Sequence, residues 1–235
     1  MKNRSKFLLV LVGMTTLYGC RGDPPVEPRV TPEIGGRELR PPRAGIEVGS
    51  LYYVRETPTN SLRRPANLER LCDVHLARYN VMPSSAKVSD IDLLGKLDAD
   101  GSLNVVKQAL VNVGLSGQVS RYYEYKLVNV TQTDISYQDA QRIFENRAFR
   151  EDCTAWRENI AGQNWGQYQI TAIKTGDIEF ARKSGSGLNA DLSAKLAKVE
   201  PGIKASIKIE TKADFSGKGV VVVFSPILRN QAVQQ

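Results

Sequence analysis

The feature that most constrains the fold of this sequence is a strict alternation of apolar and polar side chains over residues 203–215. The apolar positions are Ile203, Ala205, Ile207, Ile209, Thr211, Ala213 and Phe215. Successive side chains of a β-strand point to opposite faces, so this pattern predicts a long strand with one buried face. Residues 216–219 then turn the chain. Residues 220–224 are all apolar and predict a return strand that is buried on both faces and ended by Pro226.

The remaining patterns mix short helices with strands. Strands are predicted at residues 51–54 and 118–130, and a hairpin at residues 168–181 with its turn at 175–177. Helices are predicted at residues 68–76, 103–113, 137–144, 149–160 and 188–199, the third opened by a capping box from Ser136 to Asp139. Residues 103–113 also fit a strand. Because helices and hairpins follow no regular βαβ order, we expect an α+β fold with a mainly antiparallel sheet and several short helices.

The first twenty residues read as an export signal. Lys2, Arg4 and Lys6 precede an apolar run at residues 7–12, which is shorter than the about 20 apolar residues of a membrane-spanning helix. The run ends in Leu-Tyr-Gly-Cys at residues 17–20, which resembles the lipobox of bacterial lipoproteins. The tyrosine departs from that pattern, in which a small or β-branched residue is usual.

The lipobox resemblance implies a specific maturation. Residues 1–19 would be removed as the signal peptide, and Cys20 would carry lipid, including a fatty acyl chain such as palmitate on its new amino group. Arg21 follows the cysteine, which favours the bacterial outer membrane, and we expect the domain to face the periplasm. The sequence leaves two points open: the face of that membrane, and an ordinary signal peptide in which Cys20 is merely the next residue.

A proline-rich tether is predicted at residues 20–45. It contains Pro24, Pro25, Pro28, Pro32, Pro41 and Pro42, and such a stretch has too little apolar surface to fold alone. We expect a single domain at residues 46–228 and a frayed tail at 229–235. Removing the three positive charges of residues 1–19 reduces the net charge from +7 to +4. A net charge this small does not indicate nucleic-acid binding.

Two cysteines remain besides Cys20. Cys72 and Cys153 form an even pair in a chain with an export signal, and such pairs are usually oxidised, so we predict a disulfide between them. Two free, buried thiols are the alternative. His75, three residues after Cys72, suggests a metal pair or catalytic dyad, but no further ligands stand at metal-binding spacing. We therefore expect no metal and no cofactor.

One pair of motifs points to an enzyme. Ser84–Lys87 spells S-x-x-K and residues 174–176 spell K-T-G, which together resemble signatures of penicillin-binding proteins and serine β-lactamases. The resemblance implies Ser84 as the nucleophile, Lys87 as its activator and Lys174 as a carboxylate-binding residue. The S-x-x-K follows Pro83 in a loop-like stretch, the S-D-N element is missing, and the K-T-G fits a hairpin turn.

These observations favour a non-enzymatic role and leave the serine acyl-transfer enzyme as an alternative. We expect a lipid-anchored envelope protein that binds or braces another envelope protein, with Tyr122, Tyr123 and Tyr125 as candidate contact residues. A core role for one face of that tyrosine strand is equally consistent with the pattern. A surface-exposed or pore-forming lipoprotein is a further alternative, because residues 203–215 are long enough to cross a bilayer as a strand.

Overall fold

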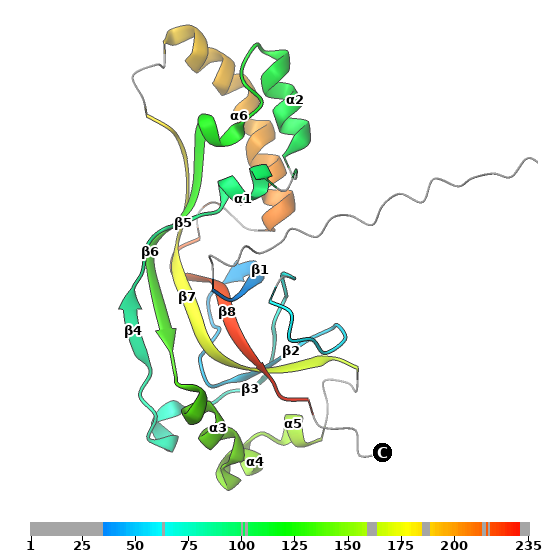
Figure 1. The fold of residues 1–235 in the computed structure, drawn as a ribbon, viewed down its shortest axis with the longest axis vertical. Coiled ribbons are helices and arrows are strands. Elements are labelled where there is room, and N and C mark those ends of the chain that lie inside the picture. The colour runs from blue at the N-terminus through cyan, green and yellow to red at the C-terminus, as the bar shows by residue number, and fades with distance from the viewer. Residues whose placement is uncertain are drawn as a thin grey trace, which may run out of the picture.

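Two long antiparallel strands, β6 (Tyr123–Asp134) and β7 (Gly166–Arg182), form the spine of the structure (Figure 1). The structure is a computed structural model that describes residues 35–62, 64–99, 101, 103–158, 164–184, 189–212, 215 and 217–230. Its sheet has eight strands in the order β1-β8-β7-β2-β3, with β6 added along β7 and with β4 and β5 paired to β6. All of these strand pairs are antiparallel, so the predicted α+β class is confirmed.

The other strands are short. They are β1 (Arg37–Arg43), β2 (Leu51–Val54), β3 (Glu69–Cys72), β4 (Ser84–Lys87), β5 (Ile91–Asp92) and β8 (Val220–Leu228). The predicted strand at residues 51–54 is confirmed as β2. The predicted strand at residues 118–130 starts later, at Tyr123, because residues 119–121 form a 3-10 turn.

Helices gather at the two ends of the sheet (Figure 1). One end carries α1 (Leu94–Ala99), α2 (Asn104–Asn112) and α6 (Ala190–Thr211); the other carries α3 (Tyr137–Glu145), α4 (Arg147–Asp152) and α5 (Thr154–Arg157). Each group covers its own apolar core, the first built around β6 and α6 and the second around β2, β8 and α4. The Ser136 cap is confirmed, since its side chain accepts from the backbone N–H of Asp139.

Residues 203–211 correct the principal sequence prediction, because they belong to helix α6. Ile203, Ile207 and Thr211 are buried at a spacing of four, in line with Leu196 and Val199 of the preceding turns. Lysine, alanine and glutamate between them are good helix formers. Contact with α2 and with the sheet core outweighs the about 3 kcal/mol that Pro201 costs inside a helix. The predicted stop before Pro201 is therefore also wrong.

The K-T-G stretch at residues 174–176 is not a hairpin turn. It lies in the middle of β7, where Thr175 stands between Thr131 of β6 and Val221 of β8. A Cβ on Gly176 would lie 2.7 Å from the carbonyl oxygen of Val128. The glycine permits close approach of two strands, so it does not mark a turn.

Three further predictions are wrong at their boundaries. The tether ends earlier than residue 45, because β1 joins the sheet with Arg37 opposite Phe224; as an edge strand it tolerates prolines. Residues 69–72 form β3, not a helix, because they pair with β2. β8 continues through Pro226 to Leu228, and Arg229 and Asn230 of the predicted frayed tail are held by side-chain hydrogen bonds.

Candidate functional site

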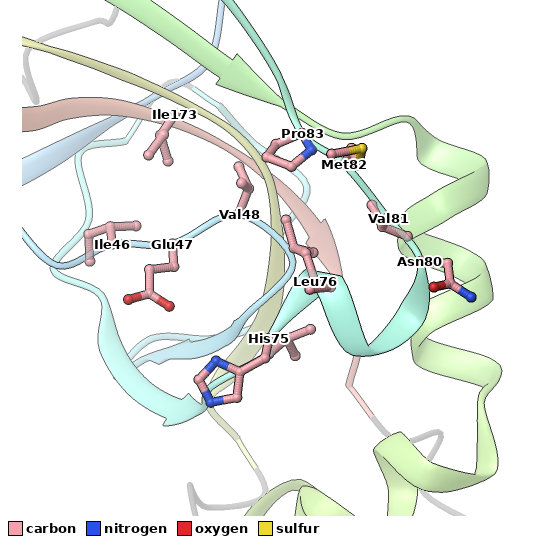
Figure 2. A pocket seen from close by; sticks show the side chains of 12 residues that line it. Ile46, Glu47, Val48, His75, Leu76, Asn80, Val81, Met82, Pro83 and Ile173 are labelled. Atoms are coloured by element: carbon pink, nitrogen blue, oxygen red, sulfur yellow. The ribbon is translucent and has the colours of Figure 1, made fainter.

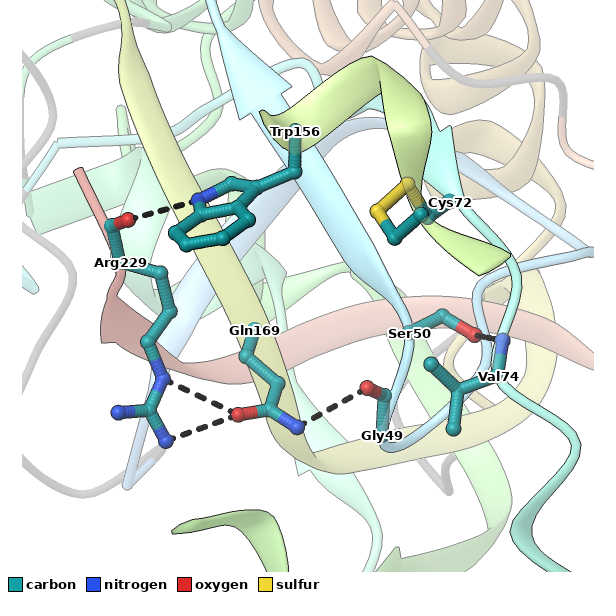
Figure 3. The surroundings of a disulfide bond; sticks show 8 residues. Gly49, Ser50, Cys72, Val74, Trp156, Gln169 and Arg229 are labelled. Atoms are coloured by element: carbon teal, nitrogen blue, oxygen red, sulfur yellow. Dashed lines mark hydrogen bonds between the residues drawn. A yellow bond between two sulfur atoms is a disulfide. The ribbon is translucent and has the colours of Figure 1, made fainter. Parts of the chain in front are cut away.

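A disulfide fixes the lower end of the sheet. Cys72 of β3 and Cys153, which lies between α4 and α5, are bonded across a sequence separation of 81, with a Cα–Cα distance of 5.6 Å. Figure 3 shows this bond beside the indole of Trp156. Because the bridge ties the α4–α5 layer to the edge strand β3, it stabilises the wall on which the neighbouring groove is built.

A buried polar network lies next to the disulfide (Figure 3). The Arg229 guanidinium donates to the Gln169 side-chain oxygen at 2.9 and 3.1 Å, and the Gln169 amide donates to the carbonyl oxygen of Gly49 at 3.1 Å. The Trp156 indole N–H donates to the carbonyl oxygen of Arg229 at 3.0 Å. Burial lowers the pKa of Arg229. Each of these groups forms a hydrogen bond with a buried neighbour, so the role of the network is structural.

The candidate binding site is an apolar groove of about 760 Å³ (Figure 2). Its walls are Ile46, Glu47, Val48, Val74, His75, Leu76, Ala77, Asn80, Val81, Met82, Pro83 and Ile173. Met82 is 91% exposed and stands at its rim, whereas Val48 and Val81 are buried in its wall. An apolar cavity of this size with a few polar groups is typical of ligand or peptide sites. No sequence pattern marked it, because its residues come from three separate segments.

His75 lies at this groove with an exposed side chain and precedes the 3-10 turn Leu76–Tyr79. It has no thiol partner, because Cys72 is in the disulfide. Within the described part of the chain, no three His, Cys, Asp or Glu residues form a group that could hold a metal ion.

The S-x-x-K residues do not form a catalytic pair. Residues 84–87 are strand β4, so Ser84 and Lys87 point to opposite faces of the sheet. The Ser84 hydroxyl donates to an Asp134 carboxylate oxygen at 2.5 Å. Hydrogen bonds from Gln132 and Ser84 hold the pKa of Asp134 below its usual value. Lys174 lies on the Ser84 face but two strands away, opposite Gln132. Serine acyl transfer is therefore not supported by this geometry.

The three candidate contact tyrosines are mostly core residues. Tyr123 and Tyr125 are each 1% exposed and pack against Phe180 and Phe215. Burial raises the pKa of Tyr123 to about 12, and its hydroxyl donates to the carbonyl oxygen of Leu196 in α6. Tyr122 is half-buried. The alternative prediction of a core role is correct for Tyr123 and Tyr125.

Helices α2 and α6 leave large apolar side chains in solvent. Val105 and Val111 on α2 are 83% and 51% exposed, and Ile209 on α6 is 73% exposed. The two helices pack against each other over the same end of the sheet (Figure 1). This layer therefore combines a buried apolar face with unburied apolar positions.

The N-terminal predictions fall outside the described residues. Cys20 and most of the tether belong to residues 1–34. Among the described helices, none is both long and apolar enough to cross a membrane.

Comparison with known proteins assigns no family. No protein-family model and no curated protein matches the chain. Among solved structures, a bacterial gasdermin from Bradyrhizobium tropiciagri is similar over 83% of this chain and 79% of that chain, with 12% sequence identity and a TM-score of 0.29. At this TM-score, the likeness assigns neither a fold family nor an activity to the chain.

Proposed function

We propose that this chain is a lipid-anchored envelope protein of the pore-forming class, whose folded domain inserts strands into a bilayer. The observation that carries the proposal is the alternation of apolar and polar side chains at residues 203–215. This pattern is typical of a strand, although residues 203–211 are helical in the folded state. Helix α6 buries Ile203 and Ile207 but leaves Ala205 and Ile209 in solvent. In a strand, all four side chains share one face. The span exceeds the about 9–11 residues that a strand needs to cross a bilayer.

The sheet offers a position for this strand. β7 pairs with β8 only as far as Gly176, and its last residues, 177–182, pair with β6 alone among the described strands. The open edge is touched by the chain just before β8, where the Ile178 N–H donates to the carbonyl oxygen of Gly217. Residues 203–215 lie directly upstream. In extended form they continue β8 antiparallel to β7, with residues 213–215 opposite residues 180–182, and residues 203–212 pair there only if β7 lengthens beyond Arg182.

The strands β6 and β7 already carry the required pattern beside that edge. Tyr125 and Leu127 share one face with Phe180 and Ile178, whereas Lys126 and Glu179 share the other. In the folded state α6 and its neighbours cover the apolar face. Unwinding α6 therefore exposes one apolar sheet face together with a new strand of matching alternation, as membrane-crossing β-sheets require.

Dye release from vesicles of phosphatidylethanolamine and phosphatidylglycerol tests this function. We expect the protein to release dye, and Ile209→Glu to reduce the release rate about tenfold, because a charge on the lipid face costs on the order of 1–2 kcal/mol. Lys208→Glu is the matched control, since it places the same residue on the polar face of the strand. Both positions are exposed on α6, so both variants should melt within a few degrees of the parent. Absence of release by the parent protein, or equal loss in both variants, contradicts the proposal.

A second candidate function is a non-enzymatic binding module for another envelope protein, and the apolar groove favours it. Its test is photo-crosslinking in living cells from a reactive side chain at Met82, with one at the similarly exposed Val105 as control. We expect one dominant crosslinked protein other than a second copy of this chain, and from Met82 only. Cys20→Ser removes the proposed anchor and should abolish that product. A crosslinking pattern shared by Met82 and Val105 argues against a groove-specific partner.

A further inference from the structure

Strand β4 is an open edge of the sheet. It pairs with β6 on one side, and no described strand lies on its other side. Every residue from Met82 to Asp90 is exposed, including both faces of β4. An edge with exposed backbone groups and no covering layer is a template for pairing with another strand.

The register shows which backbone groups are open. Ser84 lies opposite Asp134 and Ala86 opposite Gln132, and the Val88 N–H donates to the carbonyl oxygen of Val130. In an antiparallel pair, alternate residues turn their N–H and C=O groups toward the partner strand. Ser84, Ala86 and Val88 therefore bond to β6. Ser85 and Lys87 turn their backbone groups away from the sheet.

Two exposed apolar side chains flank these residues. Met82 is 91% exposed and Val88 is 36% exposed, and their even spacing places them on the same face of the extended segment. A two-fold axis through Ser85, perpendicular to the sheet, brings Met82 of one copy opposite Val88 of a second copy, twice by symmetry. Cross-strand apolar pairs of this kind stabilise antiparallel sheets.

The same register brings a lysine to the groove. Lys87 of the second copy falls opposite Pro83, which lines the groove together with Glu47 (Figure 2). Among the described residues, neither Lys87 nor Glu47 takes part in an ion pair. The lysine of each copy is thereby brought to the Pro83 side of the other copy's groove, and Glu47 lies on the far side of that groove.

We propose that a second copy of this chain binds along β4, with Ser85 on the two-fold axis and Met82 against Val88. The N–H and C=O of Ser85 bond to those of its symmetry mate, and the Lys87 N–H bonds to the carbonyl oxygen of Pro83 in the other copy. The two sheets become one continuous sheet. This dimer is independent of the proposed membrane function, because it uses the opposite sheet edge from the one at which residues 203–215 are placed.

Site-directed disulfide crosslinking of the full-length chain in membranes tests the register. Hydrogen-bonded residues opposite each other lie about 5.5 Å apart at Cα, which is within the range for a disulfide. We expect Ser85→Cys to form a covalent homodimer under mild oxidation. Ser84→Cys and Ala86→Cys should fail alone but crosslink to each other when the two chains are co-expressed. The parent chain controls for Cys20.

A second variant separates dimerisation from crosslinking. Met82→Arg should convert the dimer to a monomer in sedimentation experiments in detergent, whereas Val105→Arg, at a similarly exposed position on α2, should not. Self-crosslinking by Ala86→Cys in place of Ser85→Cys overturns the register and the Met82–Val88 contact. No dimer from the parent chain and no crosslink from Ser85→Cys overturns the proposal altogether.

Discussion

At the scale of single residues, most groups that suggested chemistry have structural roles. Cys72 is bonded to Cys153, Ser84 donates to Asp134, and the hydroxyl of Tyr123 donates to α6. Each is held by a partner that lies far away in the sequence. Several large apolar side chains, Met82 and Ile209 among them, remain exposed. Their solvent exposure is the reason why the proposals concern binding surfaces and membrane insertion.

The disulfide gives a prediction at this scale. Cys72→Ser together with Cys153→Ser should lower the free energy of unfolding by about 4 kcal/mol, because the bond closes a long loop of the unfolded chain. Urea unfolding of the oxidised parent, the reduced parent and the double variant measures this. The reduced parent should match the double variant. A difference below about 1 kcal/mol between oxidised and reduced parent contradicts a stabilising bond.

At the scale of elements, α6 is the segment in which local pattern and tertiary structure disagree. The Arg182 side chain donates to Glu200 at 2.6 Å, and Lys204 bonds the same carboxylate at 3.0 Å. Arg40 donates to the carbonyl oxygen of Glu210 at 3.0 Å. These contacts fasten the helix to β7 and β1. They keep this segment helical, although its apolar and polar side chains alternate as in a strand.

Glu200 gives a pH prediction for this element. Hydrogen bonds from Arg182 and then Lys204 lower its pKa below the usual 4.5. A carboxyl group with a lowered folded-state pKa contributes stability above its unfolded pKa, and that contribution is lost as the pH falls through the folded value. Glu200→Gln should therefore destabilise the protein at pH 7 and have less effect below about pH 4. Urea unfolding at both pH values measures this, with the exposed Glu179→Gln as control. Equal destabilisation by Glu200→Gln at both pH values contradicts it.

At the scale of the whole molecule, the sheet connects two helical layers with separate cores. The lower layer carries the disulfide and the groove, and the upper layer carries α6. Residues 20–34 remain as the proposed tether between Cys20 and β1, and a proline-rich stretch of that kind extends by about 3.1 Å per residue. The Cys20→Ser chain used in the crosslinking test should move from the membrane fraction to the soluble fraction. Retention in the membrane contradicts lipid anchoring at Cys20.

The sequence alone determined the features that depend on local chemistry. The α+β class, β2, α2, the capped helix α3 and the buried strand β8 follow from side-chain periodicity, turn residues and capping, which act over a few positions. Pairing Cys72 with Cys153 needed only the even number of cysteines after Cys20 and the predicted export signal.

Tertiary structure decided the rest. Residues 203–211 are helical because a helix buries the apolar side chains that are spaced four residues apart against α2 and β6. A spacing of two between apolar residues is equally present in the sequence. Residues 174–176 stay in one strand because β6 and β8 both pair with them, and the groove exists because three distant segments meet. These outcomes depend on contacts between residues far apart in the chain. The local periodicity of apolar side chains contains no information about such contacts.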